Sequence, residues 1–328
     1  MLTIHAAAES GLHPIPDAES LSSLPDNAVW LDLYHPSPEE EAQVEAWLGI
    51  DVPSREEMRE IEISSRLYEE DGALFMTVLA LYNADQKYAG TTDVTFILKD
   101  RYLITVRHAD PRPFSLFLQR APKLGPACRN GEFVLLGLIE AFIDRIADVL
   151  EHAGLDTEQI AVETFERSET RKKPMTTEDF KVVVGRIGLA GDLTSKARES
   201  LVTISRVLVY LTSGAGEIRL SKDVKTHIKT ALRDANQLSD HASYLANKTV
   251  FLLDATMGLI NIEQTNIIKI FSVAAAAMMP PTLIASIYGM NFSFMPELHE
   301  KWGYPAVLVL MVLSALAPFL YFKRKGWL

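Results

Sequence analysis

The sequence is poor in the residues that disulfide-stapled and metal-stapled folds require. It has 328 residues and a single cysteine, Cys128, which excludes a disulfide framework and cysteine-based zinc fingers. It contains no Gly-Lys dipeptide, which excludes a P-loop that would couple ATP to an activity. Basic residues are also in deficit, with 32 Lys and Arg against 43 Asp and Glu. We therefore expect no nucleic-acid partner and no nucleotide partner.

Charge is missing from two long stretches near the C-terminus. Residues 270–288 (IFSVAAAAMMPPTLIASIY) and residues 305–322 (PAVLVLMVLSALAPFLYF) contain no charged side chain. A helix needs about 20 apolar residues to cross a bilayer, and prolines such as Pro280 are tolerated there. Two buried core helices are the alternative interpretation. The basic cluster 323–325 that directly follows favours two transmembrane helices instead.

The basic cluster also predicts the orientation of the chain. Lys323, Arg324 and Lys325 should remain on the cytoplasmic side. Two spans then place both termini in the cytoplasm and the short connecting loop outside. The first ten residues, MLTIHAAAES, have neither a basic start nor a long apolar run, so we expect no signal peptide.

The remaining sequence predicts a mixed domain followed by long helices. Short strand-like runs such as 29–33, 75–82 and 94–98 alternate with helical patterns up to about residue 125. From residue 132 onward, apolar residues recur at helical spacing. The last helix should run without a break from about residue 221 into the first apolar stretch, a length of about 100 Å at ~1.5 Å per residue. Such a helix must pack against copies of itself or against other helices.

We therefore expect an α+β membrane protein with seven parts. These are a cytoplasmic α/β domain (1–125), a long helical hairpin (126–220), a stalk helix (221–269), a first transmembrane helix that lines a pore (270–291), an extracytoplasmic loop (292–304), a second transmembrane helix (305–322) and a basic cytoplasmic tail (323–328).

Two helices cannot enclose a water-filled path, so a pore would require several copies of the chain. One stripe of the first span is mostly small or hydroxylated and includes Thr265, Ile268, Ser272, Ala275, Met279, Thr282 and Ser286. Its hydroxyl groups would contact the water around an ion, and its apolar members would form gates. A stripe of small residues also serves plain helix packing in lipid, so both interpretations stay open at this point.

A short motif follows the first span at its outer end. Gly289 is suited to end the helix with a positive φ, and Met290 and Asn291 come next. In a symmetric assembly, Asn291 would form a ring of amides that accepts hydrogen bonds from the water shell of Mg²⁺, which sheds its water reluctantly. Glu297 and Glu300 in the loop would attract cations to this mouth.

The motif and its setting resemble the CorA family of magnesium channels. Residues 288–291 (YGMN), 295–298 (MPEL), 302–305 (WGYP) and 321–328 (YFKRKGWL) carry the resemblance. It implies a homopentamer in the bacterial inner membrane that conducts Mg²⁺, with Co²⁺ and Ni²⁺ as further substrates, and an Asn291 selectivity ring. At the inner end, where some relatives have an asparagine ring, this sequence has Thr265.

The resemblance also implies that cytoplasmic Mg²⁺ closes the channel by binding between neighbouring subunits. The acidic residues of this sequence that match such a sensor best are Glu69, Glu70 and Asp71 in the first domain and Asp234 or Asp240 on the stalk. An ordinary acidic loop and ordinary stalk charges are the competing interpretation.

Two alternatives to a magnesium channel remain. A zinc transporter of the same superfamily would share the architecture, although Met290 favours magnesium. A membrane-anchored divalent-cation sensor or scaffold would use the two spans only as a tether. Neither these alternatives nor the channel requires enzyme activity.

Overall fold

The computed structural model describes residues 1–8, 11–16, 21–86, 88–121, 130–170, 175–213, 222–291, 295–296 and 300–327, without the side chains of 166–170. The described chain divides into two compact units, Met1–Leu252 and Leu253–Leu328. The fold is a mixed α/β region, long helices and two C-terminal apolar helices, which confirms the predicted fold class.

The first unit contains a seven-stranded mixed sheet in the order β2-β1-β3-β7-β6-β5-β4. Neighbouring strands are antiparallel except for β3 and β7, which are parallel. The strands are β1 (Leu2–Ala8), β2 (Gly11–Ile15), β3 (Ala28–Tyr34), β4 (Leu67–Glu70), β5 (Ala73–Tyr82), β6 (Gly90–Lys99) and β7 (Tyr102–Arg107).

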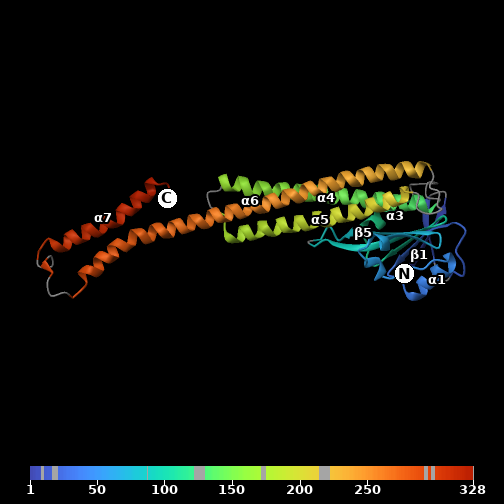
Figure 1. Ribbon diagram of the computed structural model, residues 1–328, viewed down its shortest axis with the longest axis horizontal. Coiled ribbons are helices and arrows are strands. Elements are labelled where there is room, and N and C mark those ends of the chain that lie inside the picture. The colour runs from blue at the N-terminus through green and yellow to red at the C-terminus, as the bar shows by residue number, and fades with distance from the viewer. Residues whose placement is uncertain are drawn as a thin grey trace. The chain divides into compact units, whose positions relative to one another are not determined.

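The helices up to residue 120 are short, and the four that follow are long. They are α1 (Pro38–Leu48), the 3₁₀ turn η2 (Glu57–Arg59), α2 (Ile63–Arg66), α3 (Arg112–Arg120), α4 (Gly131–Thr170), α5 (Thr177–Thr212), α6 (Lys222–Tyr288) and α7 (Gly303–Arg324). Within the first unit, α4 and α5 lie along one face of the sheet and α1 lies on the other (Figure 1).

The two faces of the sheet bury separate cores. Alternate residues of β5 and β6, such as Met76 and Phe96, pack with residues of α3, α4, α5 and α6. The residues between them, such as Phe75 and Ile97, pack with Val44 of α1 on the other side. This is the alternation that a strand buried on both faces requires.

Capping residues begin two of the helices, as their sequences predict. Ser37 caps α1, and the Glu40 carboxylate accepts a hydrogen bond from the backbone N–H of Ser37 at 2.8 Å. Thr176 and Asp179 form the same reciprocal arrangement at the start of α5. Strands β6 and β7 form a hairpin, with Asp100 at φ 52° in the turn between them.

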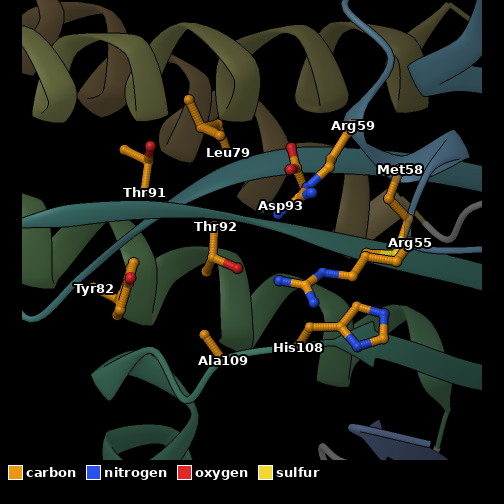
Figure 2. A pocket seen from close by; sticks show the side chains of 10 residues that line it. All are labelled: Arg55, Met58, Arg59, Leu79, Tyr82, Thr91, Thr92, Asp93, His108 and Ala109. Atoms are coloured by element: carbon orange, nitrogen blue, oxygen red, sulfur yellow. The ribbon is translucent and has the colours of Figure 1, made fainter.

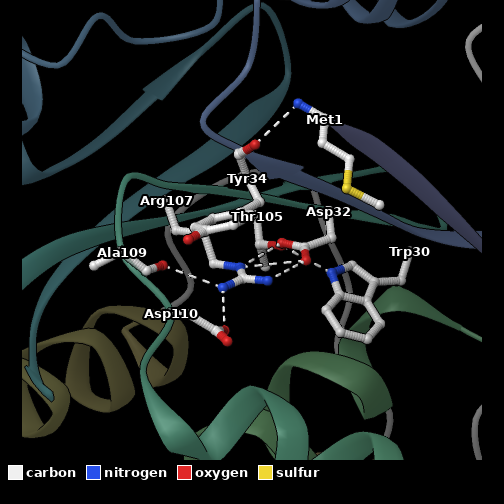
Figure 3. Close-up of polar contacts among 8 residues, drawn as sticks. All are labelled: Met1, Trp30, Asp32, Tyr34, Thr105, Arg107, Ala109 and Asp110. Carbon is white, nitrogen blue, oxygen red and sulfur yellow. Dashed lines mark hydrogen bonds and ion pairs between the residues drawn. The ribbon is translucent and has the colours of Figure 1, made fainter. Parts of the chain in front are cut away.

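A buried ion pair connects β3 to β7 where the two strands run parallel (Figure 3). The Arg107 guanidinium donates to Asp32 Oδ2 at 2.9 Å, and both side chains are less than a tenth exposed. The Thr105 hydroxyl donates to Asp32 Oδ1 at 2.7 Å and accepts from the Trp30 indole at 2.9 Å. Every polar group of this network is therefore hydrogen-bonded, as burial demands.

Candidate pore-lining surface and outer motif

In the second unit, α6 and α7 each carry one partly buried seam. On the C-terminal part of α6 the seam consists of 273, 276, 277, 280, 281, 284 and 288, and on α7 it consists of 303, 307, 311, 314, 315, 318 and 322. Both sets repeat every three or four residues, the spacing of one helix face. Since α7 runs back from the end of α6 (Figure 1), the two seams are where these helices face each other.

The predicted stripe lies on the opposite side of α6 from this seam. At 100° per residue, its seven members are centred about 150° away from the seam. All seven are exposed, including Ile268 at 64% and Met279 at 72%. The structure therefore brings the stripe together on a surface that α7 leaves uncovered.

Two hydroxyl groups of the stripe are already bonded to their own helix. Thr265 Oγ1 donates to the Asn261 carbonyl, and Thr282 Oγ1 donates to the Met278 carbonyl, both at 2.8 Å. Each hydroxyl proton is used in this way, so each oxygen presents only lone pairs outward. Lone pairs accept hydrogen bonds from water that surrounds a cation.

The end of α6 differs from the expected helix cap at Gly289. Helix α6 does end directly before Gly289, but the glycines with positive φ among the described residues are Gly11, Gly49, Gly72 and Gly326, so the expected positive φ at Gly289 is wrong. Instead the Gly289 N–H bonds the Ala285 carbonyl at 2.9 Å, and the Met290 N–H bonds the Ile287 carbonyl at 3.3 Å. Tightening the last turn satisfies these carbonyls without a left-handed residue.

Asn291 follows this tightened turn directly and is exposed. Nearby, Glu300 lines a cavity of about 360 Å³ together with Tyr288, Gly289 and Tyr304. The Glu300 carbonyl accepts the Gly303 N–H at 3.0 Å, which connects the loop to the start of α7. Glu297, the other predicted cation-attracting residue, lies outside the described residues.

Both apolar stretches form helices that are long and apolar enough to cross a membrane. Pro280 and Pro281 lie inside α6, so the carbonyls of Ala276 and Ala277 lack the N–H donors that a regular helix supplies. Large apolar side chains such as Leu313 and Leu320 remain more than half exposed on α7. Exposed apolar surface of this extent suits a lipid environment.

The predicted acidic sensor residues are not gathered within one chain. Glu69 and Glu70 end β4, and Asp71 follows at φ 49° in a turn where its carbonyl accepts a hydrogen bond from Lys99. Asp234 instead lines a cavity of about 240 Å³ beside Glu140 and Asp144, and Asp240 is exposed. Within the described ranges, no group of three His, Cys, Asp or Glu is placed to hold a metal ion.

Comparison with known proteins gives consistent matches over the chain. The family described as CorA-like Mg²⁺ transporter protein matches residues 25–324. The magnesium transport protein CorA of Escherichia coli strain K12 is 37% identical over 302 residues, which cover 92% of each chain. The Salmonella typhimurium strain LT2 protein of the same name is 36% identical over 312 residues and 95% of each chain.

A solved structure agrees with the fold. The CorA magnesium transporter from Methanocaldococcus jannaschii superposes with a TM-score of 0.79 at 21% identity. The match covers 100% of this chain and 99% of that one. At this identity the likeness establishes the fold, including the two C-terminal helices.

Proposed function

Since this chain belongs to the family of CorA-like Mg²⁺ transporter proteins, we propose that it forms a passive channel for the influx of hydrated Mg²⁺. The proposal includes a homopentamer in the bacterial inner membrane with both termini in the cytoplasm. It also includes Co²⁺ and Ni²⁺ as minor substrates and closure by cytoplasmic Mg²⁺. The family is one of transporters, so no enzyme activity is proposed.

The observation that carries the proposal is the position of the α6 stripe. Seven residues from Thr265 to Ser286 lie exposed on the face that α7 does not cover. Copies of the chain arranged around an axis would turn this face inward and α7 outward. Hydroxyl groups at Thr265, Ser272 and Thr282 would then contact water in the pore, and Ile268 and Met279 would form narrow apolar rings.

The exposed amide of Asn291 is the proposed selectivity group at the outer mouth, after Gly289 and Met290. Mg²⁺ keeps several of its waters in most protein sites. A ring of neutral amide oxygens would accept hydrogen bonds from those waters, whereas a ring of carboxylates would hold the ion more tightly. Glu297 and Glu300 would raise the cation concentration near this ring.

The membrane potential would drive the ion inward. Moving one charge through 100 mV is worth about 2.3 kcal/mol, so a divalent ion gains about 4.6 kcal/mol. This free energy is sufficient to drive ions inward through a passive channel whenever the channel is open. Closure would come from Mg²⁺ held between Glu69, Glu70 or Asp71 of one subunit and Asp234 or Asp240 of its neighbour.

A flux assay in liposomes tests the channel directly. Purified full-length protein should admit Mg²⁺ under an inside-negative potential, and cobalt hexammine should block it because that complex resembles Mg²⁺ with its water shell. Zn²⁺ flux without Mg²⁺ flux would favour the zinc transporter. No flux of any divalent cation would favour the sensor or scaffold.

Two variants separate the selectivity ring from a general loss of function. Asn291→Ala should abolish Mg²⁺ flux while the oligomer still assembles. Asn247→Ala, which removes an exposed amide from the same helix far from the motif, should leave flux unchanged. Full flux through the Asn291→Ala protein would overturn the role of the ring.

A thiol-accessibility experiment tests which face of α6 lines the pore. In a Cys128→Ser background, Met279→Cys should be modified by a charged methanethiosulfonate reagent, and flux should stop. Leu313→Cys, on the exposed face of α7, should react far more slowly because lipid suppresses the reactive thiolate. The reverse order of reactivity would refute the proposed arrangement.

A further inference from the structure

The first unit contains a polar cavity, and none of its lining residues belongs to α6. Its volume is about 250 Å³, and it is lined by Arg55, Met58, Arg59, Leu79, Tyr82, Thr91, Thr92, Asp93, His108 and Ala109. Three regions contribute: the turn η2 with Arg55 two residues before it, the paired strands β5 and β6, and the segment after β7. Figure 2 shows the Arg55 side chain extending toward Thr92, with the His108 ring beside it.

Arg55 and Arg59 belong to a turn that side-chain hydrogen bonds stabilise. The Ser54 backbone N–H and hydroxyl both donate to Glu57 Oε2 at 2.8 Å, and the Glu57 N–H returns a bond to Ser54 Oγ at 3.4 Å. Met58 fixes the turn to the core with only 2% of its surface exposed. Arg55 and Arg59 flank this anchor, and both line the cavity.

Positive charge exceeds negative charge in this cavity. Asp93 is the only carboxylate among the lining residues, and its Oδ1 already accepts from Arg66 Nη2 at 3.2 Å. Burial raises the pKa of Asp93, while Arg66 and Arg59 oppose that rise. Since Arg66 balances the charge of Asp93, the charges of Arg55 and Arg59 remain in excess.

His108, one of the residues that line the cavity, has a buried ring nitrogen without a partner among the described residues. The Nε2 atom of His108 is buried and has no hydrogen-bond partner within the described part of the chain. Burial lowers the pKa of His108, and the positive charges of Arg55 and Arg59 and the nearby His35 lower it further. A buried polar atom of this kind is costly unless something bonds it. An anion in the cavity would offset the two guanidinium charges, and it would lie beside the His108 ring.

The Tyr82 side chain on β5 has room because its partner on β6 is a glycine. Tyr82 is opposite Gly90, and a Cβ atom at position 90 would lie 2.4 Å from Tyr82 Cε1. The glycine therefore lets the aromatic ring lie over β6 at one end of the cavity. The remaining volume is too small for most drug-sized ligands, which restricts the ligand to a few heavy atoms.

We propose that this cavity binds a small phosphate-class oxyanion through Arg55, Arg59, Thr92 and His108. Two guanidinium groups, a hydroxyl and an imidazole are donors that suit a tetrahedral group with several oxygen atoms. The shared chemistry is the phosphate group, supplied either as inorganic phosphate or as a small phosphate ester. All lining residues belong to the first unit, and the existence of the site does not depend on the transport proposal.

Calorimetric titration of full-length protein in detergent, without Mg²⁺, tests the proposal. Inorganic phosphate should bind saturably with one site per chain, and a parallel titration with methyl phosphate identifies whether an ester is also accepted. Arg55→Gln combined with Arg59→Gln should weaken binding by about tenfold or more for each arginine, the value of a charge-assisted hydrogen bond. Arg198→Gln, at an exposed position on α5, is the matched control and should bind as the parent does.

The Thr92→Val variant provides a second test that leaves the charges in place, and it should weaken binding by a smaller factor. Equal phosphate affinity in the parent and the double arginine variant would overturn the proposal. So would displacement of phosphate by chloride at equal ionic strength, because that result would indicate charge attraction without a built site. Absence of saturable binding of both phosphate compounds would also refute it.

Discussion

The buried Asp32–Arg107 pair allows a stability prediction with a defined magnitude. Arg107 donates to both oxygens of Asp32 at 2.9–3.2 Å and to the Ala109 carbonyl at 3.1 Å. Its guanidinium also lies 4.4 Å from the ring centres of Tyr34 and Phe114. Arg107→Met would leave the Asp32 carboxylate buried with only the Thr105 hydroxyl as a strong donor.

Removing one partner of such a buried pair costs about 3–5 kcal/mol in the free energy of unfolding. Replacing both partners, with Asp32→Leu added to Arg107→Met, should recover most of that loss because no buried charge remains. About 1 kcal/mol should persist, since the Thr105 hydroxyl then lacks its acceptor. The exposed pair Arg120–Asp144 is the control, and Arg120→Met should cost less than about 1 kcal/mol.

Urea unfolding of the full-length protein in detergent measures these differences. Trp30 is fully buried and donates to Thr105, so its fluorescence reports on this region once the other three tryptophans are replaced by phenylalanine. A loss below about 1 kcal/mol for Arg107→Met would refute the reasoning. A double variant less stable than the single variant would refute it as well.

The remaining predictions concern pH, the pore and the sensor. Burial lowers the pKa of His5 to about 4, so the unfolded chain binds a proton first as the pH falls from about 6.5, and stability should decrease by up to about 3 kcal/mol by pH 4. His5→Phe, which keeps the stacking on Trp30, should remove this part of the acid sensitivity in urea titrations at several pH values. Met279→Asp should hydrate the narrow apolar ring and increase resting leak in planar bilayers, and an unchanged leak would argue that Met279 faces protein. Asp71→Ala with Asp234→Ala should leave current at millimolar internal Mg²⁺, and normal closure would remove both residues from the sensor.

Local signals in the sequence predict much of the secondary structure. Helix caps and tight turns involve only three or four consecutive residues, so the local sequence is enough to identify them. Examples are the caps at Ser37 and Thr176 and the turn at Asp100. The long helices α4, α5 and α6 follow from apolar spacing alone. The seven residue ranges assigned to parts of the chain stay predictions.

Strand β1 shows where local reasoning is insufficient. Its sequence, LTIHAAA, has little β-propensity in its alanines, and local pattern alone does not predict a strand there. Pairing with β2 on one side and β3 on the other determines its conformation, because tertiary context outweighs a weak local preference. Strands β2 and β4, at the two edges of the sheet, were missed for the same reason.

Of the candidate sites, one follows from a local sequence pattern and the other depends on tertiary structure. The α6 stripe is a single-helix pattern, so its members could be predicted from spacing. The cavity around Arg55 and His108 joins residues more than fifty positions apart, and no sequence motif connects them. The conformation of Gly289 also required the structure, because a glycine permits a positive φ without requiring it.

The hydroxyl groups of the stripe discriminate better than its apolar members between a lipid-facing and a water-facing surface. Ile268 and Met279 would be stable against lipid or against a dry pore, so their exposure alone does not discriminate. The side-chain hydroxyls of Ser272 and Ser286, unlike those of Thr265 and Thr282, make no hydrogen bond among the described residues, and they lie on the uncovered face. Hydrocarbon offers them no partner, whereas a water-filled path between several copies of α6 does. Facing lipid, these hydroxyl groups would have only the carbonyls of their own helix to bond, as Thr265 and Thr282 do, whereas an inward-facing stripe would also expose them to water.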